Sequence, residues 1–314
     1  MRSGARWLTL VSLGWALARW RRLRPRSLLD NAPLEKLLAK MVPLMRLPRL
    51  IQKGHLTALA VTASSYSSGE HVTFYESAQA VQPWVRSQRK AARDRITHEH
   101  LLASSAIPFV FPAKGITIDG HTEYFGDGSM RQSAPIAAAI HLGAERVLVI
   151  GAGRMHEPRG DSAAPPSPSY PSLAQIAGHA LSNIFLDALS VDVERVQRIN
   201  QTLSLIPEEK RTHSALRPVE LLVIAPSQRL DAIAARHVGD LPGPVRTMLG
   251  ALGVTSNMAD VRGAALASYL LFEQGYTQEL MALGRADTLA RRADVCRFFG
   301  WKDTGAALRT RLPT

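Results

Sequence analysis

The chain has 314 residues, 46% of them hydrophobic, with a formal net charge of +12 and one cysteine, Cys296. This length and hydrophobic content suffice for one large core or two ordinary ones. A single cysteine excludes an internal disulfide framework and fits a reducing compartment.

The positive charge is concentrated in residues 1–53. This segment holds twelve Lys or Arg residues against two acidic residues, a net of +10, and contains Trp7, Trp15 and Trp20. Basic residues beside aromatic ones favour contact with an anionic membrane surface. A solvated helix face is the alternative. Nucleic acid is not expected, because the chain has no helix-turn-helix, zinc-finger or aromatic RNA-binding motif.

Residues 1–20 imitate a targeting signal. Two arginines precede an apolar stretch at residues 7–17, and Ala16-Leu17-Ala18 resembles a small-x-small cleavage site. The stretch is too short to span a bilayer and continues into Arg-Trp-Arg-Arg and a helical pattern. We therefore expect a cytoplasmic protein, peripheral at the membrane. Export after cleavage near Ala18 is the alternative.

The first half of the chain alternates between short helices and strands. In chain order, the patterns first predict short helices in 27–50. A hairpin follows, with strands at 56–66 and 71–76 around Gly69. A helix at 98–105, capped by Thr97, then precedes a second hairpin, with strands at 115–119 and 121–125 around Asp119-Gly120. A helix at 135–142, ended by Gly143, then leads to an apolar strand at 146–151. The apolar run predicts that this last strand is a parallel strand buried on both faces. Together with the helix and the strand that ends before Asp127, it is expected to form one βαβ unit.

The second half is mostly helical. Residues 156–171 are rich in proline and serine without periodicity, which is typical of a loop. One strand is predicted at 219–225, among helices at 173–205, 228–237, 260–272, 277–283 and 286–299. We therefore divide the chain into an α/β part at 1–155, the loop at 156–171 and a mostly helical part at 172–314.

The candidate functional residue is Asp127. It follows an apolar strand end and begins an Asp-Gly turn, so its carboxylate is expected at the carboxyl tip of a strand, where open α/β sheets keep their reactive groups. Gly128 accepts unusual backbone torsions and allows close approach of another group. The alternative is a hairpin or helix-capping turn without a chemical role.

Three other patterns do not predict a site. The side chains of His98 and His100 point apart on a helix, so no metal is expected there. The serines of 64–68 lack the glycine that precedes a nucleophile elbow. The Gly151-Ala152-Gly153 run is followed by a proline-rich stretch rather than a helix, so no dinucleotide or other cofactor is expected.

Four blocks together carry a family resemblance: Ser-Leu-Leu-Asp-Asn-Ala-Pro-Leu at 27–34, Ala-Ser-Ser-Ala-Ile-Pro-Phe-Val-Phe-Pro at 103–112, Tyr-Phe-Gly-Asp-Gly at 124–128 and His-Leu-Gly-Ala-Glu-Arg-Val-Leu-Val-Ile-Gly at 141–151. In this order they resemble the C-terminal part of a bacterial patatin-like phospholipase domain. Residues 170–314 resemble a helical extension that follows such domains. The resemblance implies an α/β fold with a mainly parallel sheet flanked by helices, followed by a mostly helical region.

The resemblance also implies catalysis by a serine–aspartate dyad. In the family a serine in Gly-x-Ser-x-Gly is the nucleophile, the aspartate of Asp-Gly accepts its proton, and a glycine-rich loop stabilises the oxyanion. Only the aspartate carries over, as Asp127 between Gly126 and Gly128. Neither Gly-x-Ser-x-Gly nor the glycine-rich loop occurs in the 314 residues, and Ser129 stands where the family usually has Gly or Ala.

The sequence thus predicts a lipid acyl-ester hydrolase by resemblance, truncated and inactive as given because the nucleophile is absent. Its expected partners are a lipid or acyl-ester substrate and an anionic membrane surface. The alternative is a non-catalytic membrane-surface or partner-binding module on the same scaffold.

Overall fold

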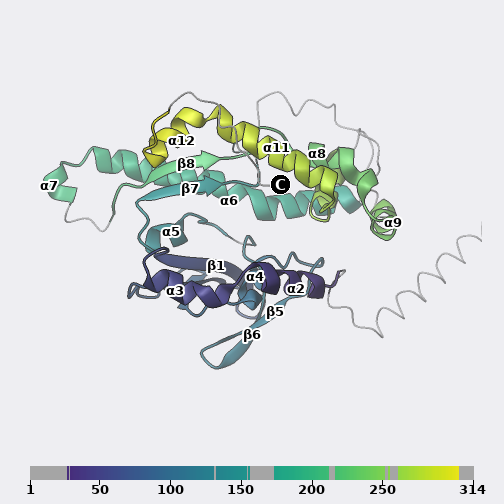
Figure 1. Cartoon of the computed structure of the whole chain (residues 1–314), viewed down its shortest axis with the longest axis horizontal. Coiled ribbons are helices and arrows are strands. Elements are labelled where there is room, and N and C mark those ends of the chain that lie inside the picture. Colours follow the sequence, from purple (N-terminus) through teal and green to yellow (C-terminus); the bar gives the residue numbers. More distant parts are fainter. Residues whose placement is uncertain are drawn as a thin grey trace, which may run out of the picture. The chain divides into compact units, whose positions relative to one another are not determined.

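The computed structural model describes residue 27 and residues 29–130, 132–153, 155, 173–211, 216–251, 254 and 261–303. The targeting-like segment at 1–20, the basic residues up to Arg26 and the loop at 156–171 lie outside the described residues. Internal contacts divide the chain into two compact units, residues 1–132 and 133–314, and each unit is treated by itself (Figure 1).

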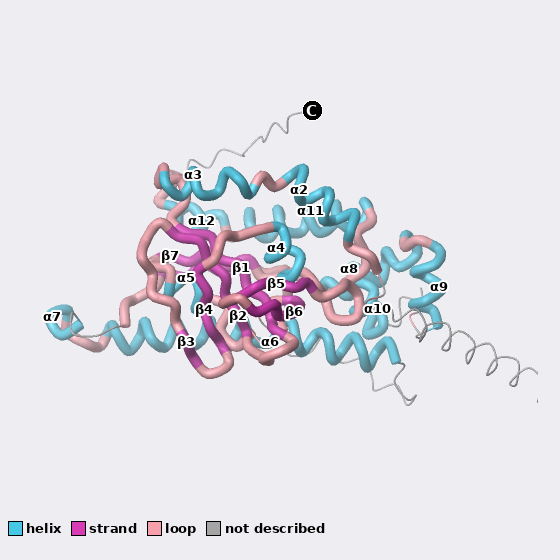
Figure 2. Tube along the Cα trace, turned by 90° about the horizontal axis from the view of Figure 1, so that it is seen from below, coloured by secondary structure: helices cyan, strands magenta, loops and turns pink. Residues whose placement is uncertain are grey.

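The first unit is built on a six-stranded sheet with the strand order β3-β4-β2-β1-β6-β5 (Figure 2). Its strands are β1 (Ala58–Ser65), β2 (His71–Ser77), β3 (Val85–Arg86), β4 (Arg89–Arg93), β5 (Lys114–Ile118) and β6 (His121–Asp127). Its helices are α2 (Ala32–Met41), the 3₁₀ helix η1 (Leu44–Arg46), α3 (Leu47–Gln52) and α4 (His98–Ser104).

The sheet is mixed, which corrects the expectation of mainly parallel pairing. Only β2 and β4 pair in parallel, while β1–β2, β1–β6, β3–β4 and β5–β6 are antiparallel. Short connections are the reason for β1–β2, β3–β4 and β5–β6, because a tight turn can join only antiparallel neighbours. Asp119 and Gly120, the predicted turn between β5 and β6, have φ values of 51° and 83°. Two successive positive φ angles are what the tightest hairpin turns require.

The core of the first unit lies between the sheet and its helices. Leu47 and Ile51 lie one turn apart on the inner face of α3 and join a cluster of buried side chains from β1, β2, β5, β6 and α4. Phe74 and Phe125 meet edge-on within it, with ring centroids 5.4 Å apart. Burying a large apolar side chain contributes about 1.5–3 kcal/mol. These contacts therefore fix β6, and with it the position of Asp127.

The second unit has a two-stranded parallel sheet of β7 (Arg146–Ile150) and β8 (Glu220–Ile224) among helices. The helices are α5 (Ala137–His141), α6 (Leu173–Ser204), α7 (Glu208–Arg211), α8 (Leu230–His237), the 3₁₀ helix η2 (Val238–Asp240), α9 (Gly243–Ala251), α10 (Val261–Ser268), α11 (Gln274–Ala290) and α12 (Arg292–Phe299). An α/β first part followed by a mostly helical region confirms the predicted fold class. None of the helices within the described residues has the length and hydropathy of a membrane-spanning segment.

Two expectations about the strand at 146–151 are wrong. The βαβ prediction fails because β6 and β7 belong to different sheets. The strand is also not buried on both faces, since Leu148 is 39% exposed and Ile150 79% exposed. Among the described residues, β8 is the only strand that β7 pairs with, and the core of this unit contacts the face that carries Val147 and Val149.

Candidate active site

Asp127 is the last residue of β6, as its sequence context predicts. The strand runs antiparallel to β1, with Asp127 opposite Ala63 and Phe125 opposite Ser65. The Phe125 side chain is fully buried in the core, whereas Asp127 is half-buried at the strand end. The sheet therefore holds one carboxyl group at a fixed position beside the turn that follows β6.

The turn after β6 is anchored by three other elements. The Asp127 N–H donates over 3.0 Å to the carbonyl oxygen of Ala106, just after α4. The Gly128 N–H donates over 3.2 Å to the carbonyl oxygen of Ser104, the last residue of α4. The Ser64 hydroxyl of β1 donates to the Met130 carbonyl oxygen over 2.8 Å. The segment after Asp127 is thus fixed from both sides.

His71, the first residue of β2, makes a further contact to this turn. Its Nε2 lies 2.6 Å from the carbonyl oxygen of Gly128. Because a carbonyl oxygen can only accept, Nε2 carries the proton. Burial lowers the pKa of His71, the charge of Arg89 lowers it further, and the hydrogen bond to Gly128 opposes both effects. The imidazole is therefore a neutral donor near pH 7.

Of the two glycines that flank Asp127, Gly128 packs against backbone and Gly126 against a side chain. A Cβ atom at Gly128 would overlap with the carbonyl group of Thr62 in β1, and one at Gly126 would overlap with the phenol ring of Tyr66. The backbone of the Asp-Gly turn therefore approaches β1 more closely than any other residue type would allow. This is the physical reason for a glycine directly after Asp127.

The carboxyl group of Asp127 is engaged by Ser129. Its Oδ1 accepts the Ser129 backbone N–H over 2.8 Å and also the Ser129 hydroxyl. A carboxylate that binds the N–H two residues later forms an Asx turn. Burial raises the pKa of Asp127, and the two hydrogen bonds from Ser129 lower it by a smaller amount.

Tyr66, just after β1, lies beside the same carboxylate. Its hydroxyl group faces the Gly126 backbone, and burial together with the charge of Asp127 raises the pKa of the phenol. The hydroxyl therefore keeps its proton at neutral pH. Around the turn after Asp127 the structure thus assembles a neutral imidazole and the Ser64 hydroxyl, while the carboxyl group itself has Ser129 as its partner and the protonated phenol of Tyr66 beside it.

His98 and His100 each bind other groups of the protein and do not face a common metal site. Nε2 of His98 lies 2.9 Å from the Val42 carbonyl oxygen, and Nδ1 of His100 accepts the Thr97 backbone N–H over 3.1 Å. Thr97 precedes α4, as predicted. Across the described residues, no group of three or more His, Cys, Asp or Glu side chains is arranged to hold a metal ion.

Sequence reasoning did not identify Ser64, Tyr66 and His71 as neighbours of Asp127. Their positions beside the turn depend on the register between β1 and β6, which joins residues about 60 positions apart in the chain. The one available signal is that all three flank the predicted turn at Gly69. Using this signal would have required knowing that the turn after Asp127 lies beside the Gly69 turn, at the same end of the sheet.

One comparison with known proteins gives a match. Residues 5–140 match the family model described as patatin-like phospholipase, which covers less than half of the chain but includes the Asp127 turn. No curated protein and no solved structure matches the chain. The resemblance found in the sequence blocks is therefore confirmed at the level of the family.

Proposed function

We propose that residues 5–140, the part of this chain that belongs to the patatin-like phospholipase family, act in lipid acyl-ester hydrolysis with Asp127 as the base. In this chemistry a serine hydroxyl attacks the ester carbonyl while its proton passes to the aspartate carboxylate. The proton then leaves with the alcohol product, and a water molecule releases the acyl group in the same way. No cofactor takes part in these steps.

The observation that carries the proposal is the environment of Asp127. The carboxyl group lies at a strand end, in a turn that β1, β2 and the end of α4 hold in place. Burial raises its pKa, and a raised pKa makes a carboxylate a stronger base toward a serine hydroxyl. A group held this firmly needs little reorganisation when a proton moves to it.

The proposal assigns the nucleophile to a serine beyond this sequence. Gly-x-Ser-x-Gly does not occur in the 314 residues, and we expect the chain by itself to be inactive. Ser129 does contact Asp127, but from the same turn, where its N–H binds the same carboxyl oxygen. We assign Ser129 to holding the turn.

A second candidate function is a non-catalytic module on the patatin-like scaffold, in the cytoplasm at a membrane surface. The contact of Asp127 with Ser129 favours it, because this carboxyl group already has two donors from its own turn. In that case Asp127 stabilises the fold and takes no part in chemistry.

The test is a hydrolysis assay with short-chain nitrophenyl esters and a phospholipid, on the chain and on its Asp127→Ala and Ser129→Ala variants. The proposal expects no turnover above buffer for any of them. Turnover that is lost in both variants would instead identify Ser129 as a nucleophile. Turnover lost in neither would point to a site away from Asp127. Circular dichroism spectra of the three proteins control for folding.

A further inference from the structure

The segment from α2 to α3 has two different faces. Leu34 and Leu38 of α2 are half-buried, and Leu47 and Ile51 of α3 are buried in the core. The other face carries large apolar side chains in solvent: Leu37 is 50% exposed, and the other exposed members are Met41 (69%), Met45 (79%) and Leu50 (42%). We call the exposed side chains of residues 36–53 the α2–α3 face.

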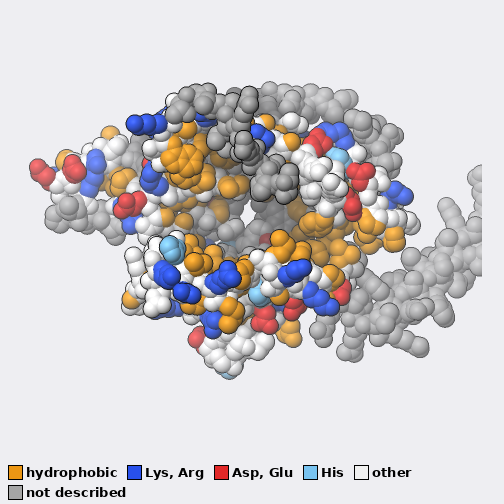
Figure 3. Space-filling view, viewed as in Figure 1, with side chains coloured by type: hydrophobic (Ala, Val, Ile, Leu, Met, Phe, Trp, Pro, Cys, Tyr) orange, Lys and Arg blue, Asp and Glu red, His pale blue; other side chains and the backbone are white. Residues whose placement is uncertain are grey.

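The charges on the α2–α3 face are all positive. Lys36, Lys40, Arg46, Arg49 and Lys53 are all exposed and lie among the apolar side chains. The neighbouring acidic residue, Glu35, is neutralised by Lys114, whose Nζ lies 2.9 Å from Glu35 Oε2. Figure 3 shows these basic side chains in blue between hydrophobic side chains in orange along α3 and α2. The face therefore combines an apolar surface with unneutralised positive charge.

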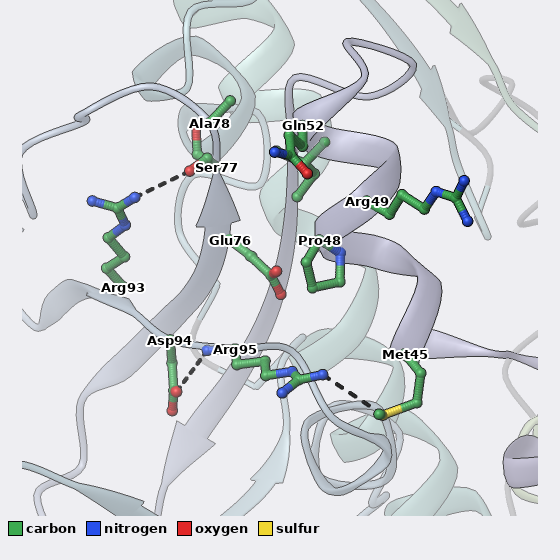
Figure 4. A pocket seen from close by; sticks show the side chains of 11 residues that line it. Met45, Pro48, Arg49, Gln52, Glu76, Ser77, Ala78, Arg93, Asp94 and Arg95 are labelled. Atoms are coloured by element: carbon green, nitrogen blue, oxygen red, sulfur yellow. Dashed lines mark hydrogen bonds between the residues drawn. The ribbon is translucent and has the colours of Figure 1, made fainter.

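An open cavity adjoins this face (Figure 4). It has a volume of about 1240 Å³ and is lined by Met45, Arg49 and Gln52 on one side and by Arg93, Asp94 and Arg95 on the other. Within the part of the chain that the structure describes, the three arginines form no ion pair with a carboxylate. Arg93 donates to the Ser77 carbonyl oxygen over 3.2 Å, and Arg95 to the Met45 sulfur over 3.6 Å.

The acidic groups of the cavity are occupied by backbone donors. Asp94 Oδ1 accepts the Arg95 N–H over 2.6 Å, and Glu76 Oε2 accepts the Ile96 N–H over 3.1 Å. Guanidinium groups without a carboxylate partner are suited to phosphate oxygens, which they bind through two parallel hydrogen bonds. With three arginines against the carboxylates of Glu76 and Asp94, the cavity keeps a net positive charge at the edge of an apolar surface.

The cavity is separate from the Asp127 turn. Asp127 lies opposite Ala63 of β1, whereas Glu76 and Ser77 lie opposite Leu59 and Ala58 at the other end of that strand. Four to five residues along a strand correspond to about 15 Å. Binding at the cavity therefore leaves the Asp127 turn free.

We propose that the α2–α3 face docks on an anionic phospholipid bilayer, with Leu37, Met41, Met45 and Leu50 entering the interface and the arginine-lined cavity receiving a phosphate headgroup. The charge complementarity argues for this occupant. Every charge on the outer face is a cation, and anionic lipids attract such clusters strongly. A protein partner would need a matching acidic surface with apolar pockets, whereas a bilayer supplies both negative charge and an apolar interior.

The test is sedimentation of the full chain with vesicles of phosphatidylcholine alone or mixed with phosphatidylglycerol. We expect binding to the mixed vesicles that weakens with added salt, because exposed charges are screened over about 8 Å at physiological ionic strength. The variant Lys36→Gln/Lys40→Gln should bind the mixed vesicles about thirtyfold more weakly, from the usual contribution of a lysine near an anionic surface. Met41→Ser/Met45→Ser should lower affinity by about a hundredfold at any salt concentration, from two methionine side chains that no longer enter the interface.

The matched control is Arg285→Gln/Lys302→Gln, which removes the same charge from two exposed positions of the second unit. It should bind like the unchanged chain. Arg93→Gln/Arg95→Gln should weaken binding to vesicles with phosphatidylglycerol more than any residual binding to phosphatidylcholine, whose phosphate is balanced by the choline cation.

Equal binding of the Lys36/Lys40 variant and the unchanged chain, equal binding to both kinds of vesicle, or no binding would each overturn the proposal. The assay measures attachment and not ester hydrolysis, so its outcome is independent of the role of Asp127.

Discussion

The imidazole of His71 donates from Nε2 to the carbonyl oxygen of Gly128 over 2.6 Å, which links the start of β2 to the turn that carries Asp127. The two residues are 57 positions apart in the chain. His71 is 5% exposed, so the carbonyl oxygen loses a buried partner if the imidazole is removed. The position of the candidate base therefore depends on a residue that takes no part in the proposed chemistry.

Replacing His71 by leucine should destabilise the first unit by about 1–3 kcal/mol, the usual cost of a buried acceptor left without its donor. His71→Gln should cost less, because the glutamine amide can donate to the same carbonyl oxygen. Urea unfolding of both variants measures the difference. Equal losses for leucine and glutamine would show that the hydrogen bond contributes little.

The same histidine predicts a pH dependence. Burial lowers the pKa of His71 in the folded protein, so the unfolded chain binds more protons in the pH range just below the ordinary value of about 6.5. The contribution of His71 to stability should be complete above that pH and decrease as the pH falls below it. In His71→Gln, the loss of stability between about pH 7.5 and about pH 5.5 should be smaller than in the unchanged chain.

Gly128→Ala should be strongly destabilising. The added Cβ atom would overlap with the Thr62 carbonyl group, which belongs to the backbone of β1 and has no room to move aside. We expect a loss of about 1–3 kcal/mol, as for other overpacked sites, or failure to fold. Gly284→Ala on α11 is the control, because a Cβ atom there meets nothing within 4 Å. Since alanine is the better helix former, the control should raise the thermal midpoint or leave it unchanged.

Asp192 on α6 should stabilise the second unit. Its side chain is 4% exposed, and it accepts the Ile136 N–H over 2.9 Å and the Arg195 guanidinium over 3.2 Å. Asp192→Ala would leave the N–H group before α5 without a partner, at an expected cost of about 2–3 kcal/mol in urea unfolding. Glu194→Ala on the same helix should cost little, because that pair with Arg198 is exposed. Equal costs would contradict this role of Asp192.

The stabilising contribution of His237 to the second unit should be lost at alkaline pH. Its ring nitrogens lie 2.7 Å from Asp240 Oδ2 and 2.8 Å from Glu279 Oε2. These bonds, the one to Asp240 first, raise the pKa of His237 above its ordinary value, so the folded protein holds the proton more tightly than the unfolded chain. The contribution of protonated His237 to the free energy of unfolding is complete below about pH 6.5. It is lost as the pH rises through the pKa of His237 in the folded protein. The difference in thermal midpoint between the chain and His237→Gln should therefore shrink as the pH rises.

Local patterns in the sequence predicted most of the elements. The hairpin at Gly69, the hairpin at Asp119-Gly120, the helix after Thr97 and the strands β7 and β8 all have clear turn or capping signals, and all are found. The strand β4 was missed, because Arg89-Lys90-Ala91-Ala92-Arg93 has neither β-branched residues nor a regular apolar alternation. The helix α9 was also not predicted.

Sheet order could not be predicted in the same way. The βαβ prediction relied on the apolar run at 146–150, but such a run does not specify which strand it pairs with. The Asp127 position followed from local sequence. The contacts of the following turn with Ser64 and His71, and the position of Tyr66 beside Asp127, follow from long-range register. The sequence therefore located the candidate base but not its surroundings.

The central claim is that Asp127 is the catalytic base, and its most direct test is a phospholipid hydrolysis assay. The protein assayed joins this chain to the sequence encoded upstream in the same reading frame, where that sequence contains Gly-x-Ser-x-Gly. The account predicts hydrolysis by the joined protein, a loss of at least about a hundredfold in kcat for Asp127→Asn, and no activity of the 314-residue chain alone. Asp294→Asn, at a half-buried carboxylate of α12 that pairs with Arg291, is the control and should be fully active. Full activity of the joined protein with Asp127→Asn would contradict the account.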